Sequence, residues 1–390
     1  MLYIISGRMD IHTIKVEDFH SHNKGIEMFY IRADGNSQIG MGHIMRCLSI
    51  AEVMEEVTGQ KPVFITADDE CSALITDRGF ERRVLYTDYR DMLSEIVLLK
   101  DMFDTKQDSL LVDSYQVSNA YFTELRTFVW VACLEDMGIP YAVDVLINYN
   151  LYALKCKENY QNTNIKDIDK KIVQDEKIFP DKVLLGIEYM PLRKAFREKS
   201  CYKVKDKITD VIVTTGGSDP YFAAGAITDA GIQDPFLSQQ GIKWHIVSGP
   251  MNQFATVLKE HYKGYKNVVI HENVQDMKEV LLKGDVVISA AGSTIYEVSS
   301  LGVPLIVFYF AKNQQQGAEE IASVTEIVNV GCYTQGDTKV VKKILKVLTQ
   351  CVQSKLYRER LYEQEKQLID KNGAMRLVQQ LVSWRLEANT

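Results

Sequence analysis

The segment MFYIRADGNSQIGMGHIMRCLSIAEVMEE, residues 28–56, shows three patterns in succession. It begins with an apolar run at 28–32, which has the length of a buried strand. A loop with three glycines follows (Gly35, Gly40 and Gly42), and residues 44–56 have their apolar side chains at helical spacing. A strand, a glycine-rich loop and a helix in this order are typical of a βαβ unit and predict a parallel sheet.

The same alternation of short apolar runs and helical patterns continues along the chain. Further strands are expected at residues 63–67, 110–112 and 130–134 and, after a polar stretch, at 211–214, 244–247, 268–270, 286–289 and 305–308. A chain of 390 residues is long enough for two domains, each with its own core. We therefore predict an α/β protein with two doubly wound, Rossmann-like domains and a hinge near 198–206.

The predicted boundaries divide the chain into an N-terminal extension at 1–26, a first domain at 27–200 and a second domain at 201–390 that includes the C-terminal helices. The extension carries His12, His20 and His22 without the helical spacing of metal ligands. A charged stretch at 155–176 reads as a surface excursion of the first domain. Residues 371–390 have a helical period, and this helix is expected to pack on either domain.

Charge and cysteine content narrow the class of partner. The net charge of -7 and the pI of about 5.6 argue against a nucleic-acid groove or a surface drawn to anionic lipid, because both need a basic excess. The seven cysteines are scattered, with no C-x-x-C pair, so neither disulfides nor a zinc site is predicted. The longest apolar stretch, 303–311, is too short to span a bilayer. A cytoplasmic protein that acts as a monomer on a small molecule, without membrane or nucleic acid, is expected.

Ligands of open parallel sheets bind beyond the carboxyl ends of the strands, so the loops after the strands are the candidate sites. The first is the loop just quoted. Gly40 and Gly42 allow a positive φ and a close backbone approach, and the helix that follows offers free N–H groups. Because position 45 is Met, the loop lacks the full G-x-G-x-x-G pattern, and no nicotinamide or other cofactor is expected. His43 stands at the helix entrance, where the dipole favours a neutral imidazole able to act as a base. A plain capping or loop histidine is the alternative.

Two further glycine-rich loops follow strands of the second domain. The loop TTGGSDP, with Gly216, Gly217 and Ser218, is suited to line a diphosphate, or else it is an ordinary turn with Asp219 as helix cap. The second loop, SAAGSTIYE, offers N–H groups and hydroxyls for phosphate oxygens from Gly292, Ser293 and Thr294.

Glu297 and the loop after residue 308 each allow two interpretations. Glu297 lies one helical turn after Gly292, Ser293 and Thr294. Its carboxylate is predicted either to accept two hydrogen bonds from ribose or to complete a capping box with Thr294. A fourth loop, FAKNQQQ, carries Lys312, Asn313 and Gln314, whose amides are able to reach sugar hydroxyls or acetamido groups. The alternative for this loop is a polar helix start capped by Asn313.

These motifs, in this order, resemble the family of UDP-sugar hydrolases of the pseudaminic acid pathway, which are relatives of the peptidoglycan N-acetylglucosaminyltransferase. The resemblance covers residues 30–348, and its most specific part is RADGNSQIGMGHIMRCLSIA at 32–51. Further matches are VDSY ending at Tyr115, INYNLYA at 147–153, LLGIEYMPLRKAF at 184–196, TTGGSDP and SAAGSTIYE.

The resemblance implies a GT-B architecture, in which the substrate lies in a cleft between the domains and UDP rests mostly on the second one. It implies UDP-2,4-diacetamido-2,4,6-trideoxy-β-L-altropyranose as the substrate, hydrolysed to UDP and the free sugar. By motif, His43 would be the catalytic base, Asn313 and Tyr115 would face the sugar, and Ser293, Thr294 and Glu297 would hold the nucleotide. Arg32 and Asp34, which open the most specific motif, are also expected to contact the substrate.

The residues suit attack of a water activated by His43 on the anomeric carbon, with inversion and with UDP as the leaving group. No D-x-D-like pair stands at a strand end, so no metal is expected. Three rival interpretations remain. They are an inverting glycosyltransferase with a hydroxyl acceptor, a UDP-sugar 2-epimerase, and a sugar-nucleotide-binding protein without catalytic activity.

Overall fold

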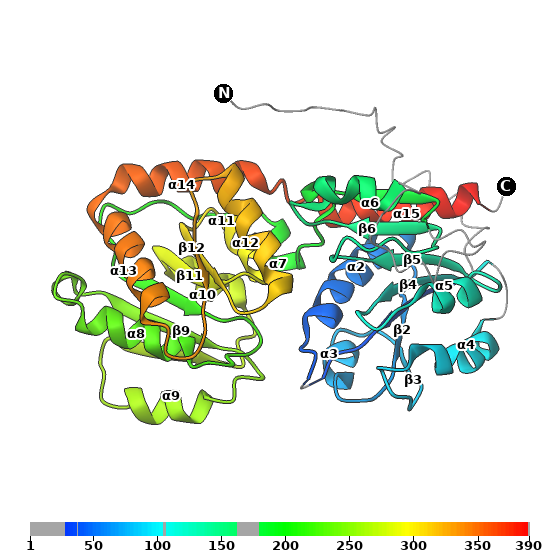
Figure 1. Cartoon of the computed structure of the whole chain (residues 1–390), viewed down its shortest axis with the longest axis horizontal. Helices are drawn as coiled ribbons and strands as arrows, with labels where there is room; N and C mark the ends of the chain where they lie inside the picture. The colour runs from blue at the N-terminus through cyan, green and yellow to red at the C-terminus, as the bar shows by residue number, and fades with distance from the viewer. Residues whose placement is uncertain (1–27, 37, 104–106, 162–178, 389–390) are drawn as a thin grey trace.

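The structure, a computed structural model, describes residues 28–36, 38–103, 107–161 and 179–388 as two lobes, each with a parallel sheet (Figure 1). The expected extension at 1–26 lies outside the described residues, and so does most of the charged stretch at 155–176. The first lobe is on the right of Figure 1 and the second on the left.

The sheet of the first lobe has seven strands, all parallel, in the order β3-β2-β1-β4-β5-β6-β7. Every side chain of the five inner strands is buried, as expected where helices cover both faces of a parallel sheet. The strands are β1 (Phe29–Ala33), β2 (Val63–Thr66), β3 (Arg82–Val84), β4 (Ser109–Asp113), β5 (Trp130–Leu134), β6 (Val145–Asn148) and β7 (Lys182–Leu185). Its α-helices include α2 (Gly42–Thr58), α3 (Ser72–Thr76), α4 (Ile96–Met102), α5 (Asn119–Leu125) and α6 (Lys157–Gln161).

The sheet of the second lobe has six parallel strands in the order β10-β9-β8-β11-β12-β13. The strands are β8 (Asp210–Thr214), β9 (Lys243–Ser248), β10 (Val268–Glu272), β11 (Val286–Ala290), β12 (Leu305–Tyr309) and β13 (Val328–Cys332). Its helices include α8 (Ala223–Gln233), α9 (Ala255–Tyr262), α10 (Met277–Lys283), α11 (Thr294–Leu301), α12 (Lys312–Val324), α13 (Thr338–Gln353) and α14 (Lys355–Leu368), and the short helix α7 (Lys194–Arg197) lies between the lobes.

The strand order creates one crevice in each sheet. From the first strand of each sheet the chain winds to one side and then returns to the other, so the neighbours β1 and β4, and likewise β8 and β11, are followed by loops that diverge. Such a topological switch point is where open α/β sheets bind ligands. The glycine-rich loops at 34–41, 215–219 and 291–293 all lie at these two points.

The last helix corrects the predicted second domain of 201–390. Helix α15 (Gly373–Glu387) crosses back to the first lobe and packs against α2 and the 3-10 turn η3 (Ile187–Tyr189) (Figure 1). The contact is close, because a Cβ added at Gly373 would lie 2.4 Å from the backbone oxygen of Met190. A helical period locates an apolar face but not its partner, so only the tertiary structure assigns this helix.

One hydrophobic cluster continues through both lobes and includes α15, while a second cluster lies within the first lobe only. The predicted hinge near 198–206 therefore packs into the hydrophobic core that the two lobes share. Among the described residues, no helix combines the length and apolar character needed to cross a bilayer.

Candidate active site between the two lobes

The loop after β1 is shaped by a short turn that brings the chain to the start of α2. The Asn36 carboxamide oxygen accepts the backbone N–H groups of Gln38 and Ile39, and the Gly40 N–H bonds back to the Asn36 carbonyl at 2.9 Å. Gly40 takes φ +81°, a conformation that favours glycine. Gly42 differs from the expectation, since it is the first residue of α2 and is not among the residues with positive φ. Its missing side chain leaves open space in front of the helix.

His43, the second residue of α2, is held by the end of β4. Its Nδ1 lies 2.7 Å from Oδ1 of the fully buried Asp113. The edge of the Tyr115 ring packs on the imidazole at 4.8 Å between centroids. A carboxylate can only accept, so the short contact requires the imidazole proton on Nδ1. In the neutral imidazole, Nε2 is then the nitrogen with the free lone pair, which is the tautomer that a general base needs.

The network around His43 contains four residues that were not predicted from the sequence, namely Arg46, Asp113, Asp136 and Tyr149. Arg46 donates through Nε to Asp113 Oδ2 at 2.5 Å, and through Nη1 to Asp136 Oδ2 at 3.1 Å and to the Tyr149 hydroxyl at 3.0 Å. The carboxylate of Asp113 ends the VD of the motif VDSY, and Arg46 follows His43 by three residues on the same helix face. The motif position of Asp113 and the spacing of Arg46 from His43 are the two sequence features from which these residues could have been predicted.

The charges around Asp113 decide its ionisation. Burial by itself raises the pKa of the Asp113 carboxyl, but the Arg46 guanidinium and His43 outweigh burial and hold that pKa below its ordinary value. Asp113 is therefore a carboxylate across the working pH range. Burial and the neighbouring carboxylate also keep the pKa of the Cys47 thiol well above its ordinary value, so Cys47 stays protonated beside Asp113.

Arg32 and Asp34 do not face the cleft, which corrects the expectation that they contact the substrate. Arg32 is fully buried, and its guanidinium pairs with Glu95 at 2.9 Å and with Asp34 at 2.7 Å. The other Asp34 oxygen accepts the Ala67 N–H at 2.7 Å. All of these bonds lie inside the first lobe. Arg32 and Asp34 therefore stabilise the loop after β1 from its buried side.

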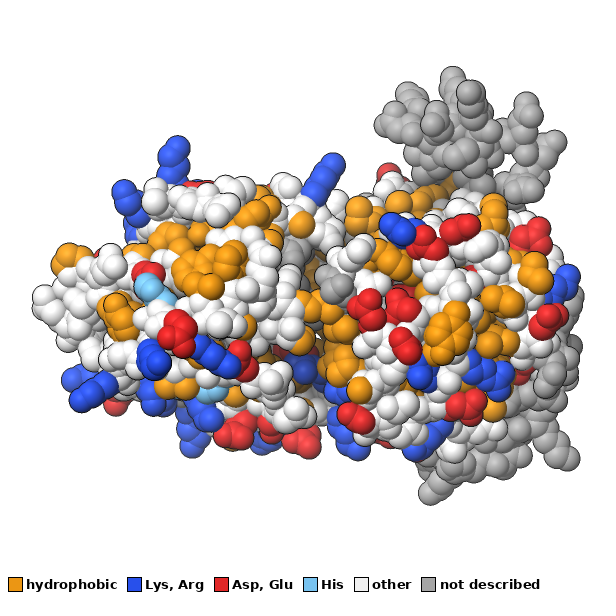
Figure 2. Space-filling model, turned by 90° about the horizontal axis from the view of Figure 1, so that it is seen from below, with side chains coloured by type: hydrophobic (Ala, Val, Ile, Leu, Met, Phe, Trp, Pro, Cys, Tyr) orange, Lys and Arg blue, Asp and Glu red, His pale blue; other side chains and the backbone are white. Residues whose placement is uncertain are grey.

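A cavity of about 270 Å³ opens between the lobes beside this network. Seen from below, the lobes are separated by a hollow on that face (Figure 2). Asn313 of α12 lines the cavity opposite Asp113 and Tyr115, so the structure brings two of the predicted sugar-facing residues together. The other lining residues are Arg46, Ser114, Leu134, Glu135, Asp136, Met137, Ile139 and Tyr141. Tyr115 also donates to Asp136 Oδ2 at 2.9 Å.

On the second lobe, the loop after β8 is exposed to solvent, and the carboxylate of its one charged residue, Asp219, points into the protein. Gly216 takes φ +80°, and Gly217 and Ser218 are exposed. The fully buried Asp219 accepts the N–H groups of Ala223 at 2.8 Å and Ala224 at 3.0 Å at the start of α8. The capping role considered for Asp219 is therefore present. The exposed glycines and the serine leave backbone groups free to meet a ligand.

The loop after β11 has the same character. Gly292 and Ser293 are exposed, Thr294 is half-buried, and a Cβ added at Gly292 would have no neighbour within 4 Å. Ser293 caps α11 without a side-chain hydrogen bond. The start of this eight-residue helix therefore follows an open, exposed loop, an arrangement that favours a phosphate.

Glu297 makes an ion pair that the sequence did not predict, and its ribose contact stays a prediction. The capping-box interpretation is wrong, because the Glu297 carboxylate pairs with Arg193 through both oxygens, with Nη2 to Oε2 at 2.7 Å. Arg193 lies in the segment that joins the lobes, directly before α7. A ribose that used both carboxylate oxygens would compete with Arg193.

The start of α12 also corrects one prediction. Gln314 is engaged within its own helix turn, where its side-chain oxygen accepts the Phe310 N–H at 2.9 Å. The capping alternative for Asn313 is wrong, because the N-cap of α12 is Ala311 and no side chain makes a cap hydrogen bond there. Lys312 and Asn313 are exposed at the same helix start.

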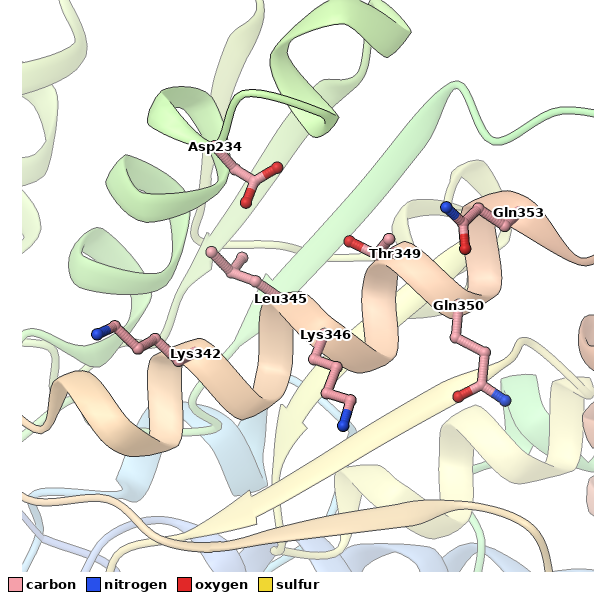
Figure 3. Close-up of a pocket in the computed structure, with 7 residues that line it drawn as sticks. All are labelled: Asp234, Lys342, Leu345, Lys346, Thr349, Gln350 and Gln353. Atoms are coloured by element: carbon pink, nitrogen blue, oxygen red, sulfur yellow. The ribbon is translucent and has the colours of Figure 1, made fainter.

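A larger cavity, of about 480 Å³, lies elsewhere, between α13 and the end of α8 (Figure 3). It is lined by Asp234, Lys342, Leu345, Lys346, Thr349, Gln350 and Gln353. It is an open surface groove away from both switch points, so we do not assign the site to it. Within the described parts of the chain, no group of three or more His, Cys, Asp or Glu side chains is arranged to hold a metal ion.

Residues 211–381 match the model of the glycosyltransferase family 28 C-terminal domain. The chain is 24% identical over 297 residues to an uncharacterized protein of Methanocaldococcus jannaschii, a match that covers 73% of this chain and 56% of that relative. It is 21% identical over 354 residues to the spore coat polysaccharide biosynthesis protein SpsG of Bacillus subtilis, covering 89% of this chain and 95% of SpsG. It is also 23% identical over 300 residues to the UDP-2,4-diacetamido-2,4,6-trideoxy-beta-L-altropyranose hydrolase of Campylobacter jejuni, covering 75% of this chain and 94% of the hydrolase.

Solved structures decide the architecture. UGT89C1 of Arabidopsis thaliana, crystallised with quercetin, superposes with a TM-score of 0.65 at 11% identity, covering 92% of this chain and 99% of that one. MurG of Acinetobacter baumannii superposes with a TM-score of 0.57 at 13% identity, covering 92% of this chain and 100% of MurG. The fold is GT-B. The predicted α/β class, the two Rossmann-like domains and the cleft between the lobes are thereby confirmed.

Proposed function

We propose that this GT-B protein hydrolyses a UDP-sugar, with His43 as the base that activates water. The observation that carries the proposal is the 2.7 Å contact between His43 Nδ1 and buried Asp113, a residue that lines the interlobe cavity. An imidazole oriented in this way has Nε2 free to take a proton. The second lobe supplies open, glycine-rich loops suited to a diphosphate.

In the proposed reaction, His43 Nε2 removes a proton from a water molecule that attacks the anomeric carbon. The bond between that carbon and the UDP oxygen breaks, and the anomeric configuration inverts. The N–H groups of Ser293 and Thr294 at the start of α11 stabilise the negative charge that develops on the departing UDP, while the Gly292 N–H donates to the Ala290 carbonyl at 2.9 Å. Asn313 and Tyr115 face the sugar from opposite sides of the cavity.

We propose UDP-2,4-diacetamido-2,4,6-trideoxy-β-L-altropyranose as the substrate. The name of the Campylobacter jejuni relative supports this choice, as do the motifs that match its family. Amide groups such as that of Asn313 are suited to acetamido substituents, which offer one donor and one acceptor each. We further expect the enzyme to act in the cytoplasm as a monomer, without a cofactor or a metal ion.

An inverting glycosyltransferase is the second candidate. The match to the glycosyltransferase family 28 C-terminal domain favours it, because that part of the chain carries the proposed UDP site. The same base would then deprotonate an acceptor hydroxyl. A protein that binds UDP-sugar without turnover is the third candidate.

Incubation of the protein with the diacetamido sugar nucleotide in H₂¹⁸O, without acceptor and with EDTA, tests the proposal. We expect UDP without label and a free sugar that carries ¹⁸O at its anomeric carbon. A strict glycosyltransferase would release UDP only after an acceptor is added. Label in UMP or in a sugar 1-phosphate would show attack at phosphorus and would refute the role of His43.

A further inference from the structure

We propose that Arg46 is a positioning residue that keeps His43 in its neutral, basic form by sharing the Asp113 carboxylate. This inference rests on the proposed function, because it concerns the base of the same reaction. A carboxylate that faced His43 alone would favour the imidazolium, which has no lone pair to accept a proton from water.

The contacts of Arg46 occupy its whole guanidinium. Nε and Nη2 both donate to Asp113, Nη1 donates to Asp136 and to the Tyr149 hydroxyl, and Nη2 also lies 3.0 Å from His43 Nδ1. These partners follow three successive strands of the sheet, β4, β5 and β6. A planar group with five N–H donors is the side chain able to make such a set of contacts. The side chain is only 13% exposed, so solvent screens it little.

The charges close to His43 come from three elements. Asp113 stands at the end of β4, Arg46 lies on α2, and the loop after β4 contributes the neutral phenol of Tyr115. Asp136, after β5, is the second carboxylate of the network, with its side chain 15% exposed. Arg46 offsets one of the two carboxylate charges. Without Arg46, the negative charges of Asp113 and Asp136 would both remain close to the imidazole at a site with little solvent.

The position of Arg46 also restricts the imidazole proton. Nη2 is a donor and cannot accept from Nδ1, so the Nδ1 proton has Asp113 as its acceptor. A cation next to Nδ1 disfavours a second positive charge on the same ring. Both effects favour a neutral imidazole with Nε2 directed to other partners, which is the state that the proposed reaction requires.

The test is the titration of the His43 imidazole in R46Q, followed by NMR of protein with ¹⁵N-labelled histidine, together with the pH profile of kcat/KM. With Arg46 removed, His43 should hold its proton to a pH higher by about 1 unit or more, the size of shift that an adjacent charge causes. The acid limb of the kcat/KM profile should move by the same amount. At pH 7 the rate should fall by up to about tenfold, the largest effect that a shift of one unit produces, and it should recover at higher pH.

Two further variants keep the test decisive. Arg126 also joins two aspartates of the first lobe, Asp144 at 2.9 Å and Asp181 at 2.7 Å, away from the cleft, so R126Q is the matched control and should leave both readouts unchanged. If R46Q does not fold, R46K keeps the charge without the fork. It should then show a shift in the same direction but smaller.

A His43 titration that is unchanged in folded R46Q would overturn the proposal, as would a rate loss that is equal at every pH. The NMR readout needs no substrate. If no UDP is released from the diacetamido sugar nucleotide but the titration still moves, the role of Arg46 stands and the proposed reaction fails.

Discussion

The two switch points of this molecule have opposite chemistry. In the first lobe, the ends of β4 to β6 and the start of α2 carry a buried network of ionised groups, with Asp113, Arg46 and Asp136 at its centre. In the second lobe, the ends of β8 and β11 carry exposed glycines and serines. Asp219 is turned inward to cap a helix, and Glu297, in the first turn of α11, is paired with Arg193. Proton transfer needs a base fixed by charged neighbours, whereas a diphosphate can be held by backbone N–H groups. The difference supports the proposal that the first lobe carries the chemistry and the second lobe binds the nucleotide.

His43→Ala is the strongest test of this division. Loss of a general base lowers a rate by about 10² to 10⁴, so kcat should fall at least about a hundredfold. UDP affinity should stay nearly unchanged, because the proposed UDP contacts lie on the other lobe. Turnover and UDP binding by calorimetry are the measurements. His261, which pairs with Asp229 on the outside of the second lobe, provides the control H261A. Near-normal turnover of H43A would move the base elsewhere.

Glu297 and Arg193 test the second lobe as a pair. If Glu297 binds ribose, E297A should weaken UDP binding by roughly 1 to 3 kcal/mol through loss of charge-assisted hydrogen bonds. R193A should have the opposite sign, because it removes the partner that now occupies both carboxylate oxygens. Calorimetric titration of UDP into each variant measures this. Equal UDP affinity in E297A and the parent protein would leave Glu297 with only its interlobe ion pair.

Gly292→Val tests the open space in front of α11. No atom lies within 4 Å of a Cβ added there, so the variant should fold normally. The new side chain would stand where the phosphate is proposed, and a clash of this kind costs about 1 to 3 kcal/mol, so UDP affinity should fall about tenfold. Gly264 also has no neighbour within 4 Å but is distant from the switch points, and G264V serves as the control. Unchanged affinity in G292V would place the diphosphate elsewhere.

Glu365 allows a smaller test, because it is a buried carboxylate whose pKa is raised by burial, in contrast to Asp113, which is paired with Arg46. The test measures how far its ionisation lowers the free energy of unfolding. It is fully buried on α14, it accepts one hydrogen bond from the Leu305 N–H at 3.2 Å, and burial holds its pKa well above the ordinary value. A raised folded pKa gives stability that is present at low pH and is lost as pH rises through that pKa. Asp113 has the opposite sign, because its lowered pKa gives stability that is lost only as pH falls.

The variant E365Q should therefore have a Tm a few degrees above that of the parent protein at pH 7 to 8. The gain should vanish below about pH 4, where an ordinary glutamate is protonated in the unfolded chain. Thermal unfolding across this pH range measures it. A gain that is the same at every pH would show an effect of packing and not of ionisation.

The strand and helix pattern could be predicted from the sequence alone, because burial between two layers of helices requires the short apolar runs that the sequence displays. All nine expected strands are present within two residues of their predicted ends. The strands left out, β3, β6, β7 and β13, are short or lie at sheet edges, where the pattern is weak. The glycine-rich loops and His43 could also be predicted, because the end of a strand is recognised from the residues next to it in the sequence.

Only the tertiary structure decided which side chains meet. Arg46 reaches partners 67, 90 and 103 positions away, and Glu297 finds Arg193 at a separation of 104, so no local pattern records these pairs. The same is true of α15. Its sequence pattern is compatible with packing on either lobe, and the structure shows that it packs on α2. A local period fixes what a segment becomes. The partner of a buried charge or an apolar face is fixed by strand order, which brings distant loop ends to one edge of a sheet.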